Sequence, residues 1–95
     1  MFPLAKEQLD EIHRHAVEEY PFECCGIVVG KPDHNTENLV YRCTNIQNKL
    51  HEKDPENYVR DARTAYNISA LEIQKLLSEA GSKGLVFKVL YHSHP

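Results

Sequence analysis

Seven consecutive residues, Cys24–Gly30 with the sequence CCGIVVG, constrain the fold of this chain more than any other stretch. The run is apolar, partly β-branched and closed by glycine, and its length is typical of a strand rather than a helix. A chain of 95 residues buries only roughly 60–65% of its unfolded surface, so each element contributes noticeably to a small core. We therefore expect a buried strand over residues 24–30.

Two helices flank this run in the sequence. Apolar residues recur at helical spacing over about residues 5–19, which predicts an amphipathic helix that Pro21 ends. A second helix is expected over residues 69–81. Ser69 and Glu72 match a capping box there, and Gly81 matches the position just past a helix end.

Two further strands complete the expected elements. Residues 39–43, LVYRC, follow a turn-rich segment and are expected to return antiparallel to the buried run, and residues 85–94, LVFKVLYHSH, follow the second helix. Residues 44–68 are polar and weakly periodic, so we expect a long connection with one short strand near residues 65–68. This order of elements predicts an α+β (α/β-like) fold, a mixed β-sheet flanked by helices.

Charge and composition narrow the functional classes. The formal net charge of −3 offers no electrostatic reason to expect a nucleic acid or an anionic membrane as partner. No apolar run approaches the roughly 20 residues that span a bilayer, and the N-terminus lacks the layout of a signal peptide. We therefore expect a cytoplasmic protein.

The three cysteines, Cys24, Cys25 and Cys43, fit this expectation as reduced, buried thiols. Cys24 or Cys25 with a histidine could form a nucleophilic pair, but no local feature indicates a lowered thiol pKa.

His92 and His94 lie two residues apart on the last expected strand. Side chains alternate between the faces of a strand, so both imidazoles should project from one face, about 6–7 Å apart at Cα. Two neutral imidazoles placed in this way chelate a borderline-soft cation, for which zinc is the usual choice. On this stretch alone, surface histidines remain the alternative.

Glu23 lies between Pro21 and the apolar run, where a carboxylate is out of place unless it meets solvent or a partner. It is either a solvated turn residue or a general base at the entrance of the strand.

The remaining histidines are weaker candidates. His13 and His15 lie two apart on a helix and so point to different faces, which prevents joint chelation. His34 and His51 lie in polar connections and are expected to be solvated.

Taken together, four features resemble the JAMM metalloprotease branch of the MPN domain family. They are the first helix, the segment YPFECCGIVVG, the capped helix and the segment YHSHP. The most specific parts are P-x-E-C-C-G and H-S-H-P in that order, and the match is closest to stand-alone bacterial and archaeal members. The resemblance implies a JAB-like (cytidine-deaminase-like) core.

The resemblance also implies a reaction and residue roles. Glu23 matches the catalytic glutamate, which acts as general base on water at the zinc, and His92 and His94 match two zinc ligands. The implied activity is cleavage of peptide or isopeptide bonds at the C-terminal glycines of ubiquitin-like proteins, with ubiquitin-like sulfur carriers as the expected bacterial partners. A non-catalytic MPN module that only binds partners is the alternative. Such modules usually lack the glutamate or the histidines.

This chain departs from the family motif after Pro95. In the family a serine that binds the oxyanion and an aspartate that is the third zinc ligand follow H-x-H, and both positions lie beyond residue 95. We therefore expect residues 1–95 to be the N-terminal portion of a single JAMM domain, incomplete at its C-terminal end and inactive by itself. The α-carboxylate of Pro95 is a conceivable substitute ligand. The last strand would then be an uncovered edge through which the chain self-associates.

Overall fold

A computed structural model describes residues 4–34 and 37–95 of the chain. Its elements follow one another as α1 (Lys6–Glu19), β1 (Cys25–Gly30), β2 (Leu39–Cys43), α2 (Gln47–Lys53), α3 (Ala70–Ser82) and β3 (Val86–His92). The expected α+β fold with helices flanking a sheet is confirmed. We expected a mixed sheet, and the described strands make two pairings that are both antiparallel.

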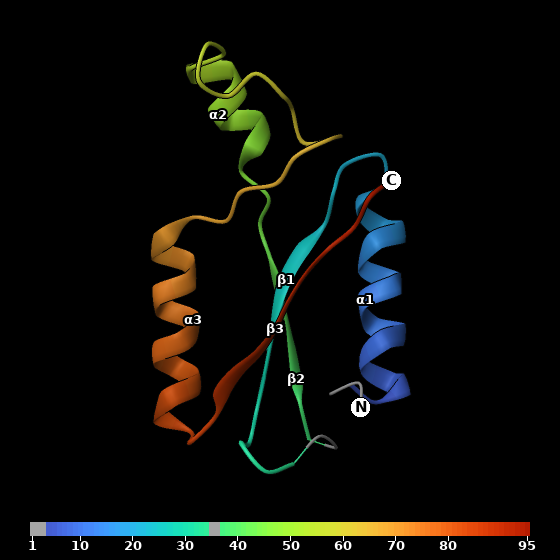
Figure 1. The fold of residues 1–95 in the computed structure, drawn as a ribbon, viewed down its shortest axis with the longest axis vertical. Coiled ribbons are helices and arrows are strands. Elements are labelled where there is room, and N and C mark those ends of the chain that lie inside the picture. The colour runs from blue at the N-terminus through green and yellow to red at the C-terminus, as the bar shows by residue number, and fades with distance from the viewer. Residues whose placement is uncertain (1–3, 35–36) are drawn as a thin grey trace.

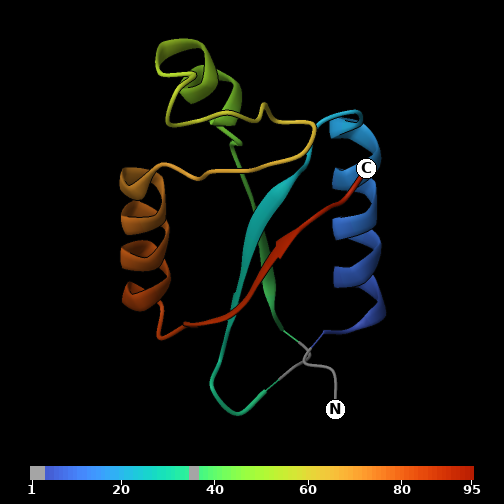
Figure 2. The ribbon, with the colours of Figure 1, turned by 45° about the horizontal axis from the view of Figure 1, so that its top comes forward.

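The three strands form one sheet in the order β2-β1-β3, so the apolar run is the central strand. Helix α1 lies on one face of the sheet and α3 on the other, while α2 lies beyond the end at which β1 begins (Figures 1 and 2). Every residue of β1 is buried. This explains why the run is apolar at each position, since each face of a sandwiched strand meets a helix.

Alternate residues of β1 contribute to two separate cores. Cys25, Ile27 and Val29 face α3, where they pack with Leu76 and Ala80. On the opposite face, the side chains of Cys24, Val28 and Tyr91 form a second core, against which Ile12 and Ala16 of α1 pack. The sheet is therefore held between two helices by apolar burial on both sides.

Gly26 belongs to the α1 face and makes room for an aromatic ring. A Cβ at this position would lie 2.3 Å from Cζ of Tyr91, so only glycine leaves space for that ring. The Tyr91 hydroxyl lies 2.8 Å from Nδ1 of His15 on α1. Both side chains are buried, and their contact links the first helix to the last strand.

The connection over residues 44–68 differs from the expectation. It contains helix α2, and residues 65–68 form no strand. Two hydrogen bonds join this segment to residues 45–46 instead: the Asn67 N–H donates to the side-chain Oδ1 of Asn45, and the Ile46 N–H donates to the Asn67 carbonyl. Because one of the two acceptors is a side chain, these bonds do not form a strand ladder.

The ends of α3 also differ from the expected caps. Ser69 is the N-cap residue but makes no side-chain cap hydrogen bond, and the Glu72 carboxylate accepts a hydrogen bond from the Thr44 N–H. The helix runs through Gly81 and ends at Ser82. Gly84 takes the left-handed conformation with φ of 74°, while the N–H groups of Gly84 and Leu85 donate to the carbonyls of Gly81 and Ala80. This pair of bonds is a Schellman motif, so the C′ glycine is Gly84.

Strand β3 lies at one edge of the sheet and is only partly covered. Its apolar side chains Val86, Phe87 and Leu90 are exposed. A register shift against β1 falls between Val28 and Val29. Within the described part of the chain, helices are all too short or too polar to cross a bilayer.

Candidate metal centre

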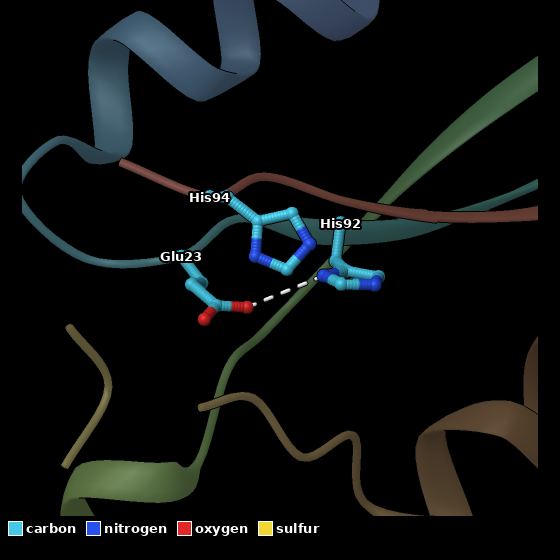
Figure 3. A group of neighbouring side chains, drawn as sticks. All are labelled: Glu23, His92 and His94. Carbon is cyan, nitrogen blue, oxygen red and sulfur yellow. Dashed lines mark hydrogen bonds and ion pairs between the residues drawn. The ribbon is translucent and has the colours of Figure 1, made fainter. Parts of the chain in front are cut away.

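Glu23, His92 and His94 come together at the end of the sheet where β1 begins and β3 ends (Figure 3). Glu23 lies two residues before the first residue of β1. His92 is the last residue of β3, and His94 lies two residues after it. One ligand atom from each side chain lies within 4.8 Å of the other two. Residues 69 positions apart in the sequence therefore share one site.

The register of the sheet brings these segments together. Cys25 of β1 pairs with His92 of β3. One residue further out, Ser93 and Cys24 exchange two hydrogen bonds: the Cys24 N–H donates to Ser93 Oγ at 2.9 Å, and the Ser93 N–H donates to the Cys24 carbonyl at 3.1 Å. Because side chains alternate along an extended chain, this leaves His92 and His94 pointing together away from Ser93. Sequence reasoning assigned no role to this serine.

Glu23 is held in place through its backbone. Its N–H donates to the Ala62 carbonyl at 2.7 Å, and its carbonyl accepts a hydrogen bond from Nδ2 of Asn45 at 2.9 Å. The residue is only 4% exposed, and its Oε1 lies 3.3 Å from Nδ1 of His92. A buried carboxylate is costly without a charged or polar partner, so this placement requires a partner in the site.

Tyr66 orients the first histidine. Its ring stacks on His92 with 4.4 Å between ring centroids and 21° between ring planes. The rings of His92 and His94 meet edge to face at 4.6 Å. These contacts restrict the imidazole rotamers. No local pattern in the sequence indicates this role of Tyr66, because only the fold reveals the stacking.

The three side chains open into a cavity of about 270 Å³. Its wall consists of Glu23, Arg60, Thr64, Ala65, Tyr66, His92 and His94. Pro95 lines two neighbouring hollows rather than this cavity. Its α-carboxylate as a ligand stays a prediction.

The other histidines lie outside the site. His13 is exposed on α1, His15 is buried against Tyr91, and His34 is exposed. His51 is in α2 rather than in a loop, and its Nδ1 lies 2.7 Å from the Tyr58 carbonyl oxygen, so it is not simply solvated.

The cysteines are free and buried, as expected. Burial raises the pKa of the Cys25 thiol to about 12 and that of Cys43 to about 11. A thiol with such a pKa is almost wholly protonated at neutral pH, which argues against a nucleophilic role for either residue.

The donor set of the site suits zinc. Two imidazoles are ligands that zinc accepts in catalytic sites, where an open position remains for a reacting molecule, and the Glu23 carboxylate lies close enough to act on that molecule. The partial exposure of both histidines leaves such a position accessible. Among the described residues, Glu23, His92 and His94 form the one group of three His, Cys, Asp or Glu side chains whose ligand atoms lie close enough to hold a metal ion.

An α+β fold with a carboxylate and two histidines at one end of its sheet is typical of a candidate metal-binding protein. The family model for prokaryotic homologs of the JAB domain matches residues 5–95. The chain belongs to this family. No curated protein matches the sequence significantly.

A solved structure supports the fold. The solution structure of protein DSY2949 from Desulfitobacterium hafniense superposes with a TM-score of 0.69 at 24% sequence identity. The match covers 97% of this chain and 56% of that protein, so the chain spans little more than half of its length. At this identity the likeness concerns the fold alone.

Proposed function

We propose that this protein is a zinc-dependent hydrolase of the JAMM type that cleaves peptide or isopeptide bonds at the C-terminal glycines of ubiquitin-like proteins, with sulfur carriers as the substrate class. The observation that carries the proposal is the convergence of Glu23, His92 and His94 within 4.8 Å in one cavity. Membership of the JAB family supports the metallohydrolase assignment.

The residues divide the chemistry between them. His92 and His94 would hold the ion, with their ring orientations set by Tyr66 and by each other. When bound, zinc supplies a Lewis acid that polarises a carbonyl and makes water more acidic. The Glu23 carboxylate accepts a proton from the attacking water and passes it to the leaving amine nitrogen. Its fixed backbone keeps that carboxylate at the mouth of the site.

The substrate class draws on the resemblance to the JAMM branch, which implies cleavage at the C-terminal glycines of ubiquitin-like proteins.

The variant Glu23→Gln separates metal binding from catalysis. In a version that extends through the serine and the aspartate of the family motif, we expect this variant to keep zinc and to lose on the order of 10²–10⁴-fold in hydrolysis rate, the range that a general base contributes. Glu79→Gln is the matched control, because Glu79 is an exposed carboxylate on α3 that pairs with Lys83. Hydrolysis of a sulfur-carrier fusion by Glu23→Gln at the control rate would remove Glu23 from the mechanism. Absence of hydrolysis by a zinc-loaded version that extends through the serine and the aspartate of the family motif would favour the non-catalytic binding module.

A further inference from the structure

One wall of the metal-site cavity is a polar segment over residues 58–66, of which the proposed mechanism uses only Tyr66. Arg60, Thr64, Ala65 and Tyr66 of this segment face the same cavity as Glu23 and the two histidines. Arg60 also lines the two adjoining hollows, of about 620 and 270 Å³. Arg60 thus lines three adjoining hollows.

Hydrogen bonds to the backbone of this segment connect it to helix α2 and to Glu23, which precedes β1. The carbonyl of Arg60 accepts from Nε2 of the buried Gln47 at 2.7 Å. The Ala62 N–H donates to Oδ1 of Asn48 at 2.8 Å, and the Ala62 carbonyl accepts from Glu23. The position of Arg60 relative to the metal ligands is therefore set in advance, which reduces the cost of ordering on binding.

Two arginines of this segment differ in their charge environment. Arg63 is neutralised by Asp61, which lies 2.8 Å from its Nη2 and also accepts from its Nε. Arg60 donates from Nη1 to the Thr64 carbonyl at 3.3 Å and makes no ion pair with any residue that the structure describes. The remaining donors of its guanidinium have the fork geometry that matches a carboxylate.

We propose that Arg60 binds a carboxylate of the substrate and so selects peptides that carry a negative charge close to the bond to be cleaved. The inference deepens the proposed function, since it concerns the substrate of the same site. The carboxylate has two possible sources, an acidic side chain or a free C-terminus, and both present the same planar group to the guanidinium.

The test measures binding rather than turnover. Three short acetylated peptides serve as probes: Ac-Gly-Gly-NH₂ is neutral, Ac-Gly-Gly-OH carries a terminal carboxylate, and Ac-Gly-Glu-NH₂ carries a side-chain carboxylate. Their dissociation constants are measured by NMR titration of the folded protein with and without zinc. We expect at least one charged peptide to bind about 1.5- to fivefold more tightly than the neutral one, the range that an exposed charge pair allows.

Variants assign that preference to one residue. Arg60→Ala should reduce the ratio to about one, Arg60→Lys should keep part of it, and Arg63→Ala should leave it unchanged because Arg63 is already paired. The charged peptide whose preference depends on Arg60 identifies the source of the carboxylate. A preference that survives in a folded Arg60→Ala protein, or no preference in the wild type, would overturn the proposal.

Failure of the inference differs from failure of the proposed function. The Arg60-dependent preference is expected in the metal-free protein as well, because the guanidinium is not a metal ligand. Loss of the preference with intact zinc binding and hydrolysis rejects only the role of Arg60. A preference without any hydrolysis by a version that extends through the serine and the aspartate of the family motif rejects only the proposed reaction.

Discussion

Replacing Gly26 with alanine perturbs the contact on which the α1 face of the sheet depends. The added Cβ would lie 2.3 Å from both Cζ and Oη of Tyr91. That ring is 8% exposed, and its hydroxyl is hydrogen-bonded to His15. The ring must therefore move within a packed core, and it belongs to the residue that precedes His92.

The cost follows from two terms. Overpacking a core by one methyl group costs about 1–3 kcal/mol. Displacing the Tyr91 hydroxyl from His15 costs about 0.5–1.5 kcal/mol more. A sum of roughly 2–4 kcal/mol is a large part of the roughly 5–14 kcal/mol expected for a domain of this size. The corresponding decrease in Tm is roughly 10–30 °C.

Urea unfolding followed by circular dichroism measures this change. Gly81→Ala is the matched control, because nothing lies within 4 Å of a Cβ there and the residue is inside α3. Alanine is the better helix former, so this control should gain about 0.5–1 kcal/mol. In a Tyr91→Ala background the cost of Gly26→Ala should largely disappear. A Gly26→Ala protein as stable as the wild type would refute the reasoning.

Three further predictions concern the pH dependence of stability, the hydrogen bond between Ser93 and Cys24, and the exposed edge strand β3. Burial lowers the pKa of His15. The contribution of neutral His15 to the free energy of unfolding is therefore fully present above the unfolded-state pKa of about 6.5 and is lost as pH falls from there toward the folded-state pKa. His15→Gln should reduce the pH dependence of the urea midpoint between pH 7 and 5, and an unchanged pH dependence would exclude His15 as its source. Ser93→Ala removes the acceptor of the Cys24 N–H and should cost about 1–3 kcal/mol in the same unfolding assay, so an unchanged midpoint would contradict that role. We propose that the edge strand β3 pairs with a second copy of the chain; Phe87→Lys at this 50% exposed position should then raise the monomer fraction in sedimentation, whereas a monomeric wild type would contradict it.

The parts of the fold that sequence predicts well are those specified by local pattern. The run CCGIVVG is apolar at each position because both faces of β1 are covered, and α1 and α3 carry helical periodicity. The site required more than periodicity. Glu23, His92 and His94 could be associated only through the motifs of a family, because the residues lie far apart until the register of β1 with β3 joins them.

The parts that sequence could not predict depend on contacts between distant residues. Helix α2 lies in a polar segment without periodicity, and the wall beside it is held by bonds such as that from Gln47 to the Arg60 carbonyl. His15 was placed correctly on a helix, but its partner Tyr91 is 76 residues away. Ser69 matched a capping box locally, yet Glu72 bonds to Thr44 from another part of the chain.

The zinc affinity of the protein tests the central claim most directly. The measurement is a competition titration against a chromogenic chelator for the wild type, His92→Ala, His94→Ala and the control His13→Ala, whose histidine is exposed on α1. If His92 and His94 are ligands, each of their variants should bind zinc at least about tenfold more weakly, since even supporting residues cost that much. His13→Ala should match the wild type. Equal affinity in all four proteins would contradict a metal site at Glu23, His92 and His94.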